Sequence, residues 1–237
     1  MESLLSVLGR FSRSDIDEIE KRDRQYRALE KLFEKTRDKE LFFKLVVLNA
    51  LLSYQLQTKG ETYWENFSKF FSENPSIDKF PEFLSKFNRR FLQAKLKRFK
   101  RAKECVNSIF EKYSLKDLGG NLSILVEELS KCLKQKKDSK TVVFSAKMFM
   151  YGYKIVFDKE PKNLEEIEIP LDSRLKKIFP ELKTWRELSS KLNIPPIRLD
   201  ALVWVPMGLR KRDLEEYPEE LREKILELKR EIEKLGT

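Results

Sequence analysis

Residues 137–151 read KDSKTVVFSAKMFMY, and this stretch decides the fold. A polar turn is followed by residues that are apolar on nearly every side of a helix with 3.6 residues per turn. The charged positions Lys140, Lys147 and Lys154 are seven apart and therefore share one narrow stripe. A helix that is apolar nearly all round is typical of a protein interior. We therefore predict a buried helix that begins at Lys140.

The place of Lys140 at the start of this helix bears on its chemistry. Burial and the positive end of the helix dipole both disfavour a protonated amine. An unprotonated lysine amine is the nucleophile of Schiff-base enzymes. A lysine at a helix start is more often solvent-facing, so residue type alone leaves both readings open.

The composition favours an all-α globular protein. Of 237 residues, 41% are hydrophobic, which is enough for a sizeable core, and only seven are glycine. Strand-like alternation bounded by Asn-Gly or Asp-Gly turns is missing. The formal net charge of +10 makes a polyanion the expected partner, with nucleic acid ahead of a membrane surface. A lysine surplus that serves solubility alone remains an alternative.

Histidine is absent, which excludes Ser-His and Cys-His nucleophiles and most zinc sites. The two cysteines, Cys105 and Cys132, are too few for a four-thiolate zinc or iron–sulfur site. We expect no metal and no cofactor. For an intracellular protein, two buried free thiols are favoured over a disulfide between them.

Nothing in the sequence indicates a membrane protein. The N-terminus MESLL carries no basic segment followed by an apolar run, and no apolar window is long enough to span a bilayer. We expect a soluble, cytoplasmic protein. Charged residues make up 37%, mostly Lys and Glu, which is typical of thermophile proteins.

Periodic apolar positions and helix breakers predict the remaining helices. They span residues 14–19, 22–33, 41–56, 61–71, 76–87, 91–114, 122–133, 173–179, 184–192, 196–205 and 218–234. Asp38 and Asp172 are well placed as N-caps, and Lys59-Gly60 is expected to end the helix 41–56. Residues 134–139 form a short polar connection between two apolar helices, which predicts a helical hairpin.

The helix 91–114 holds the densest positive cluster of the chain. Its basic residues are Lys95, Lys97, Arg98, Lys100, Arg101 and Lys103. A role in phosphate contacts and an ordinary solvated helix face are both open readings.

A helical hairpin whose second helix opens with Lys140, followed by the aliphatic-Pro-aliphatic-Asp segment at residues 169–172, resembles the helix-hairpin-helix DNA glycosylases that also act as lyases. More specifically, the chain is similar to the archaeal 8-oxoguanine DNA glycosylase/AP lyase family. The matching segments are residues 21–28 (KRDRQYRA), 48–54 (LNALLSY), 60–64 (GETYW), 140–144 (KTVVF), 169–172 (IPLD) and 194–204 (IPPIRLDALVW).

The resemblance implies an architecture of two helical lobes with an active-site cleft between them. Residues 46–155 would form a middle lobe ending in the helix-hairpin-helix element and the lysine helix. Residues 1–45 and 156–237 would form the second lobe.

The resemblance also implies the residues of the site. Lys140 would attack the sugar C1′ of 8-oxoguanine nucleotides and form a Schiff base, and Asp172 would be its catalytic carboxylate partner; β-elimination would then cleave the strand. The flipped base would be bound by the residues Gln25, Trp64, Phe144, Asp200 and Trp204. Gln25 would read it by hydrogen bonds, Trp64 and Phe144 would stack on its two faces, and the other two would complete the pocket. The implied enzyme is a cytoplasmic, nucleoid-associated monomer that acts on damaged DNA, duplex and potentially single-stranded, without metal or cofactor.

Two departures from the wider superfamily qualify this reading. The turn at residues 134–138 is lysine-rich and lacks the usual glycine, and the four-cysteine iron–sulfur cluster of some relatives is absent. The competing hypotheses are a glycosylase for another damaged base, a non-catalytic helix-hairpin-helix DNA-binding protein, and an all-α scaffold whose basic face meets acidic partners.

Overall fold

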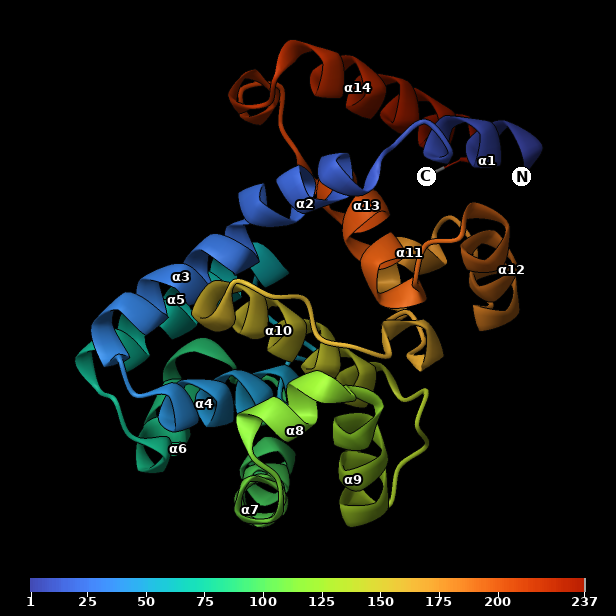
Figure 1. Ribbon diagram of the computed structural model, residues 1–237. Coiled ribbons are helices and arrows are strands. Elements are labelled where there is room, and N and C mark those ends of the chain that lie inside the picture. Colours follow the sequence, from blue (N-terminus) through green and yellow to red (C-terminus); the bar gives the residue numbers. More distant parts are fainter. Residues whose placement is uncertain (237) are drawn as a thin grey trace. The chain divides into compact units, whose positions relative to one another are not determined.

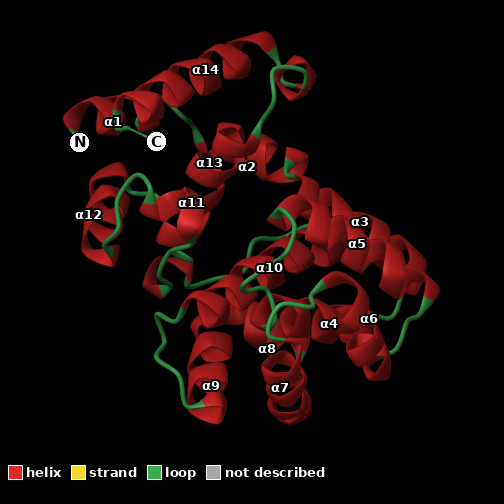
Figure 2. Cartoon of the chain, turned by 180° about the vertical axis from the view of Figure 1, so that it is seen from behind, coloured by secondary structure: helices red, strands yellow, loops and turns green. Residues whose placement is uncertain are grey.

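The computed structural model describes residues 1–236, and within that range the chain forms helices and loops without a strand (Figures 1 and 2). The predicted all-α class is confirmed. The chain divides into two compact units. Unit 1 comprises Met1–Asp23 with Ile167–Thr237, and unit 2 comprises Arg24–Glu166.

Unit 2 is built around α10 (Lys140–Phe157), which begins at the predicted lysine. The other elements of the unit, with η for short 3-10 helices, are α3 (Arg24–Thr36), α4 (Lys39–Leu51), α5 (Gly60–Glu73), η1 (Ile77–Lys79), α6 (Phe80–Phe87), α7 (Leu92–Lys112), α8 (Leu115–Gly120), α9 (Ser123–Leu133) and η2 (Leu164–Glu166). α10 packs against α4, α3 and α9, α4 also packs against α7, and α3 packs along α5. The apolar helix predicted from the sequence thus lies in the interior of this unit.

Unit 1 is organised around α13 (Pro196–Gly208). Its other elements are α1 (Glu2–Leu8), α2 (Arg13–Arg22), α11 (Ser173–Lys176), α12 (Leu182–Leu192), η3 (Asp213–Glu216) and α14 (Glu219–Lys234). α13 packs against α2, α11, α12 and α14. Arg198 of α13 donates from Nε to Glu20 Oε1 of α2 at 2.9 Å, and both side chains are buried. Burying two opposite charges together avoids the large cost of burying one alone.

Helices α4 and α10 approach each other closely at Gly152. The ring centroids of Phe43 and Phe149 are 4.6 Å apart, and those of Phe42 and Phe43 are 5.3 Å apart. A Cβ atom on Gly152 would lie 3.0 Å from ring atoms of Phe42 and Phe43, which are both fully buried. The missing side chain is therefore what lets the two helices pack at this distance.

Some helix ends differ from those predicted. α4 ends at Leu51 instead of residue 56, and Lys59 is the N-cap of α5 instead of a helix end. The difference has a tertiary component, because the Leu52 carbonyl accepts a hydrogen bond from Asn88, 36 residues away, at 2.9 Å instead of one from a following turn of helix. The N-cap of α2 is Ser12, not Ser14. The sequence missed α1 and α8, which are short helices that pack on longer neighbours.

The expectation of two free thiols was wrong. Cys105 of α7 and Cys132 of α9 form a disulfide, with a Cα–Cα distance of 5.8 Å. The cysteines are 27 positions apart in sequence, and only the packing of α7 against α9 brings them together. The bond ties α7 to the helix that precedes the turn before Lys140.

The division into units begins the second unit earlier than the predicted lobe boundary at residue 46. Arg24 is its first residue because α3 packs against α4, α5 and α10. Likewise, η2 stays with unit 2, so the later boundary falls at Ile167 instead of residue 156.

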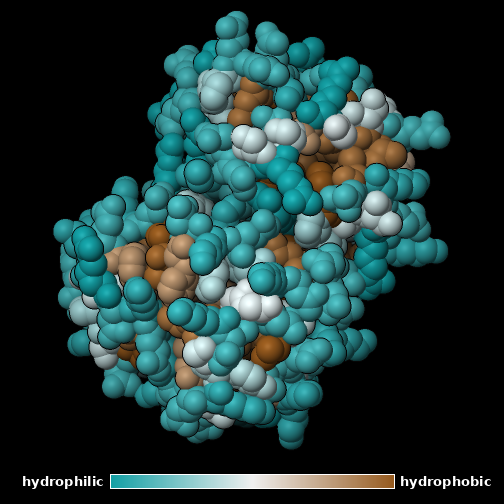
Figure 3. All heavy atoms as spheres, in the orientation of Figure 1, coloured by the Kyte–Doolittle hydropathy of each residue, from teal (hydrophilic) through white to brown (hydrophobic). Residues whose placement is uncertain are grey.

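Hydrophilic residues cover most of the face shown in Figure 3, with smaller hydrophobic areas between them. Among residues 1–236, we find no helix with the length and apolar content that a membrane crossing requires.

We predict that Gly152→Ala destabilises the protein by about 1 kcal/mol, because overpacking costs ~1–3 kcal/mol and the gain in helix propensity offsets ~1 kcal/mol. The melting temperature should fall by roughly 2–4 °C. Gly120→Ala is the matched control, since a Cβ there meets nothing within 4 Å. Thermal unfolding of both variants measures this difference. An equal change in melting temperature would show that the protein does not require a glycine at the α4–α10 contact.

Candidate active site

Lys140 is the first residue of α10, and its side chain is half-buried. The preceding residue, Ser139, is the N-cap but makes no side-chain capping hydrogen bond. The next residues, Thr141 to Val143, are buried. Lys140 therefore lies where the polar turn meets the buried part of α10.

Phe144 lies one turn after Lys140, on the same side of α10. Its ring contacts the fully buried indole of Trp64 on α5, with ring centroids 5.8 Å apart and ring planes at 80°. The predicted pair of stacking residues is thus brought together, edge to face. Stacking on the two faces of one base stays a prediction, and it requires a reorientation of these nearly perpendicular rings. The indole Nε1 of Trp64 is buried and has no acceptor within residues 1–236.

Gln25 is the second residue of α3 and is 2% exposed. The next residue, Tyr26, contacts Tyr151 of α10 with ring centroids 5.1 Å apart. α3 is also tied to α5, because the Arg24 guanidinium forms an ion pair with Glu65. The two residues in this ion pair directly adjoin Gln25 and Trp64 in sequence. Unit 2 therefore holds Lys140, Phe144, Trp64 and Gln25 on helices that pack together.

Asp172 is the N-cap of α11 in unit 1, as predicted. Its Oδ1 accepts hydrogen bonds from the backbone N–H groups of Arg174 and Leu175, each at 3.0 Å. Its Oδ2 accepts from Nε1 of Trp204 at 2.8 Å. Both carboxylate oxygens are thus oriented, and the capping role and a catalytic role are compatible.

Trp204 itself is held from two sides. The guanidinium carbon of Arg174 lies 3.9 Å from the centroid of the indole ring, and Nη1 of Arg174 donates to the Trp204 carbonyl at 3.1 Å. Asp200 lies one turn earlier on α13 and is 2% exposed. Unit 1 therefore brings together Asp172 and Trp204, with Asp200 on the same side of the helix that carries Trp204.

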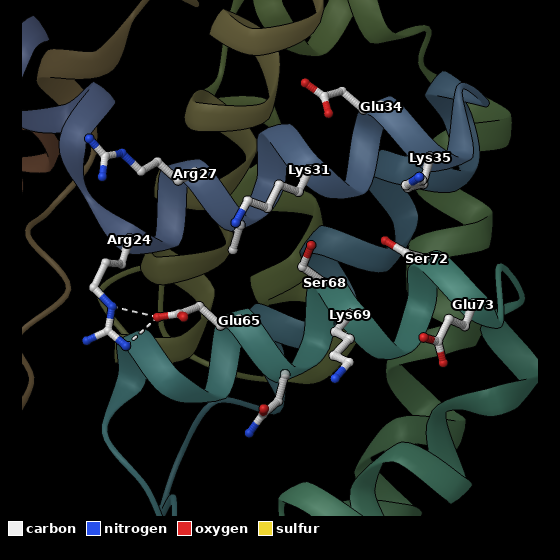
Figure 4. Close-up of a pocket in the computed structure, with 12 residues that line it drawn as sticks. Arg24, Arg27, Lys31, Glu34, Lys35, Glu65, Ser68, Lys69, Ser72 and Glu73 are labelled. Atoms are coloured by element: carbon white, nitrogen blue, oxygen red, sulfur yellow. Dashed lines mark hydrogen bonds and ion pairs between the residues drawn. The ribbon is translucent and has the colours of Figure 1, made fainter.

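A groove of about 860 Å³ runs between α3 and α5, and none of the seven predicted site residues lines it. Figure 4 shows the ion pair between Arg24 and Glu65 at one end and Lys35 and Glu73 toward the other. Small residues such as Ala28 and Ser68 lie along it. The groove is thus a mixed-charge surface feature, separate from the buried positions of Gln25 and Trp64.

A buried polar network supports the loop between α4 and α5. Asn88 donates to the hydroxyl of Tyr63 at 3.0 Å and accepts from Nζ of Lys95, while Tyr63 donates to Oδ1 of Asn49 at 2.6 Å. Nζ of Lys95 also donates to the Gln55 carbonyl at 3.3 Å. Burial, and then the charge of Arg90, lower the pKa of Lys95 from 10.5 to about 8.

The basic segment of α7 is thus not one surface cluster. Lys95 is 0% exposed and Arg98 is half-buried, whereas Lys97, Lys100 and Arg101 are exposed. The sequence did not predict this division, because the residue type of a lysine or arginine does not indicate whether its side chain is buried. It also did not separate Lys147 from the rest of its stripe, yet Lys147 is 1% exposed, with Nζ 5.1 Å from the centroid of the Tyr151 ring.

A family model described as N-glycosylase/DNA lyase, AGOG, matches residues 5–236. The chain belongs to this family. It is 38% identical over 225 residues to the N-glycosylase/DNA lyase of Methanococcus maripaludis, covering 88% of each chain. It is 36% identical over 208 residues to the N-glycosylase/DNA lyase of Thermococcus kodakarensis, covering 83% of this chain and 79% of that one.

The fold is also similar to a solved structure of the family. The crystal structure of Pa-AGOG, an 8-oxoguanine DNA glycosylase from Pyrobaculum aerophilum complexed with 8-oxoguanosine, matches with a TM-score of 0.77 and 25% identity, covering 94% of both chains. The chain is accordingly an N-glycosylase with DNA lyase activity, which disfavours the non-catalytic and scaffold hypotheses. Among the described residues, no group of three His, Cys, Asp or Glu is arranged to hold a metal ion.

The lowered pKa of Lys95 predicts a pH-dependent stability. Below about pH 8 the amine is protonated in both the folded and the unfolded chain, so its contribution is constant. Between about pH 8 and 10.5 the unfolded chain binds more protons, and stability therefore rises with pH. We expect the melting temperature of the wild type, relative to that of Lys95→Met, to rise between pH 7.5 and 10. A constant difference would mean that Lys95 titrates normally.

Proposed function

We propose that this enzyme excises 8-oxoguanine from DNA and that Lys140 is its nucleophile. The observation that carries the proposal is the position of Lys140: it opens a buried helix, it is half-buried at a polar turn, and an aromatic side chain lies one turn away. The likeness to a glycosylase complexed with 8-oxoguanosine supports the choice of substrate.

In the proposed reaction, the Lys140 amine attacks C1′ of the damaged nucleotide, the N-glycosidic bond breaks, and its electron pair leaves with the base. Opening of the sugar ring gives a Schiff base between Nζ and C1′. Loss of a C2′ proton and departure of the 3′-phosphate then cleave the strand by β-elimination. Hydrolysis of the imine releases the enzyme.

Asp172 is the proposed carboxylate partner of Lys140. A carboxylate stabilises the positive charge that develops on the sugar as the base departs, and it moves protons between the reacting groups. The hydrogen bonds from the α11 backbone and Trp204 support this role, because they hold both oxygens in fixed directions.

Gln25, Trp64, Phe144, Asp200 and Trp204 are proposed to receive the flipped base. The amide of Gln25 supplies both donors and acceptors for a base edge, and aromatic rings replace the stacking that the base loses on leaving the duplex. The net charge of +10 supports binding of DNA through its phosphates. The enzyme is proposed to act in the cytoplasm, at the nucleoid, as a monomer on duplex and single-stranded DNA.

Borohydride reduction tests the nucleophile. We expect the wild type to form a covalent adduct with DNA containing 8-oxoguanine and Lys140→Gln to form none. Lys154→Gln is the matched control, because it makes the same change on the same helix about 21 Å further along its axis. The proposed mechanism is wrong if the wild type forms no adduct, or if Lys140→Gln is trapped as well as the wild type.

A panel of lesions tests the substrate in the same assay. Oligonucleotides that contain 8-oxoguanine, uracil or an alkylated base differ only at the target position. Fastest excision of 8-oxoguanine is the expected result. Fastest excision of another lesion would support the alternative glycosylase.

Asp172→Asn tests the carboxylate. Asparagine is as good an N-cap as aspartate, so the melting temperature should stay within a few degrees of the wild type. The loss of the negative charge should lower the single-turnover rate of base excision by about 100-fold or more. Asp213→Asn, a change at another half-buried carboxylate of unit 1, should leave the rate unaltered. A wild-type rate in Asp172→Asn would remove Asp172 from the mechanism.

A further inference from the structure

Arg98 lies in the basic segment of α7 but does not belong to its exposed surface. The nearby residues Lys97 and Lys100 are exposed, while Arg98 is half-buried. Burial lowers the pKa of Arg98, and its guanidinium nevertheless stays charged at neutral pH. A charged group that is held inward needs partners, and Arg98 has them on three separate segments.

The first partner of Arg98 is the end of α4, where Nε donates to the Leu51 carbonyl at 2.8 Å. The second is the turn before α10, where Nη2 donates to Oε1 of Gln135 at 3.1 Å. The third is α10 itself, where Nη2 donates to Oγ1 of Thr141 at 2.8 Å. One planar guanidinium thus joins the end of α4, the turn and the first turn of the lysine helix.

The start of α10 depends on such a contact because its own cap is incomplete. Ser139 makes no side-chain capping hydrogen bond. Helix ends without capping partners fray. Thr141 is 8% exposed and directly follows Lys140, so the bond to its hydroxyl holds the backbone within one residue of the nucleophile.

We propose that Arg98 is a positioning residue for the lyase reaction: it fixes the first turn of α10 and thereby the direction in which the Lys140 amine points. This inference rests on the proposed function of Lys140. A displacement of about 1 Å at a reacting group lowers rates by about 100-fold. Loss of the guanidinium should therefore slow Schiff-base formation while leaving DNA binding largely intact.

A direct phosphate contact is the competing role for a cation on α7. The structure disfavours it for Arg98, because Nε and Nη2 are already engaged by oxygen atoms of the protein. A phosphate contact would also have a different signature. Its loss would weaken DNA binding and reduce the slope of log affinity against log salt concentration by about 0.9. The rate of Schiff-base formation in the enzyme–DNA complex would not change.

The test measures single-turnover borohydride trapping with the enzyme in saturating excess, together with the dissociation constant for the same DNA. We expect Arg98→Met to slow trapping by about 100-fold. Arg98→Lys should slow it less, because lysine keeps the positive charge but cannot place donors at all the positions of a planar guanidinium. Thr141→Val removes only one acceptor at nearly constant shape, and it should slow trapping by about 10-fold. Dissociation constants should change by less than about threefold.

Thr141→Val keeps the test decisive if Arg98→Met folds poorly. Arg37→Met is the control, because this arginine also belongs to unit 2 but lies just after α3 and donates from its side chain to the Glu34 carbonyl of that neighbouring helix at 3.2 Å, and its rate should equal that of the wild type. Combining the Arg98 and Thr141 changes should slow trapping by less than the product of the single effects, as expected for residues that share one contact.

Three results would overturn the positioning role: an unaltered trapping rate in Arg98→Met, an effect confined to the dissociation constant, or a wild-type rate in Thr141→Val. Failure of the proposed function itself would be recognised separately. In that case the wild type would form no covalent adduct, or Lys140→Gln would form one. Both results are obtained without any Arg98 variant.

Discussion

The burial of α10 is the constraint on which the rest of unit 2 depends. Its apolar side chains pack against α4, α3 and α9, and Gly152 lets α4 approach closely enough for Phe42 and Phe43 to fill the contact. A helix held along its whole length has a fixed start, and the residue at that start is Lys140. The position of the proposed nucleophile is therefore set by core packing, and the proposed chemistry takes place at the turn where the buried helix begins.

That turn is secured mainly from α7. The disulfide between Cys105 and Cys132 and the hydrogen bond from Arg101 to the Cys132 carbonyl, at 3.0 Å, hold the end of α9. Arg98 holds the turn and the beginning of α10. A disulfide together with an abundance of Lys and Glu is a combination typical of hyperthermophile proteins. Contacts from α7 thus hold the helix before the lysine-rich connection and the helix after it.

The sequence predicted those features that follow from local pattern. The start of α10, the cap at Asp172 and the all-α class all depend on periodicity or on a residue next to a helix end. The end of α4 was predicted wrongly, and the Leu52 carbonyl at that end accepts a hydrogen bond from Asn88, which is distant in sequence. The disulfide depends on helix packing. The functions of Lys95, Arg98 and Lys147 could not be separated from those of exposed lysines and arginines, because burial is decided by partners on other helices. The family resemblance, not periodicity, supplied the reaction.

The most direct measurement of the central claim is the location of the covalent bond. The reduced enzyme–DNA adduct is digested with nuclease and protease, and the peptide that carries the sugar remnant is identified by mass spectrometry. We predict that the modified residue is Lys140, in a peptide from the start of α10. A remnant on Lys147, on another lysine or on the N-terminal amine would contradict the claim that the first residue of the buried helix provides the nucleophile.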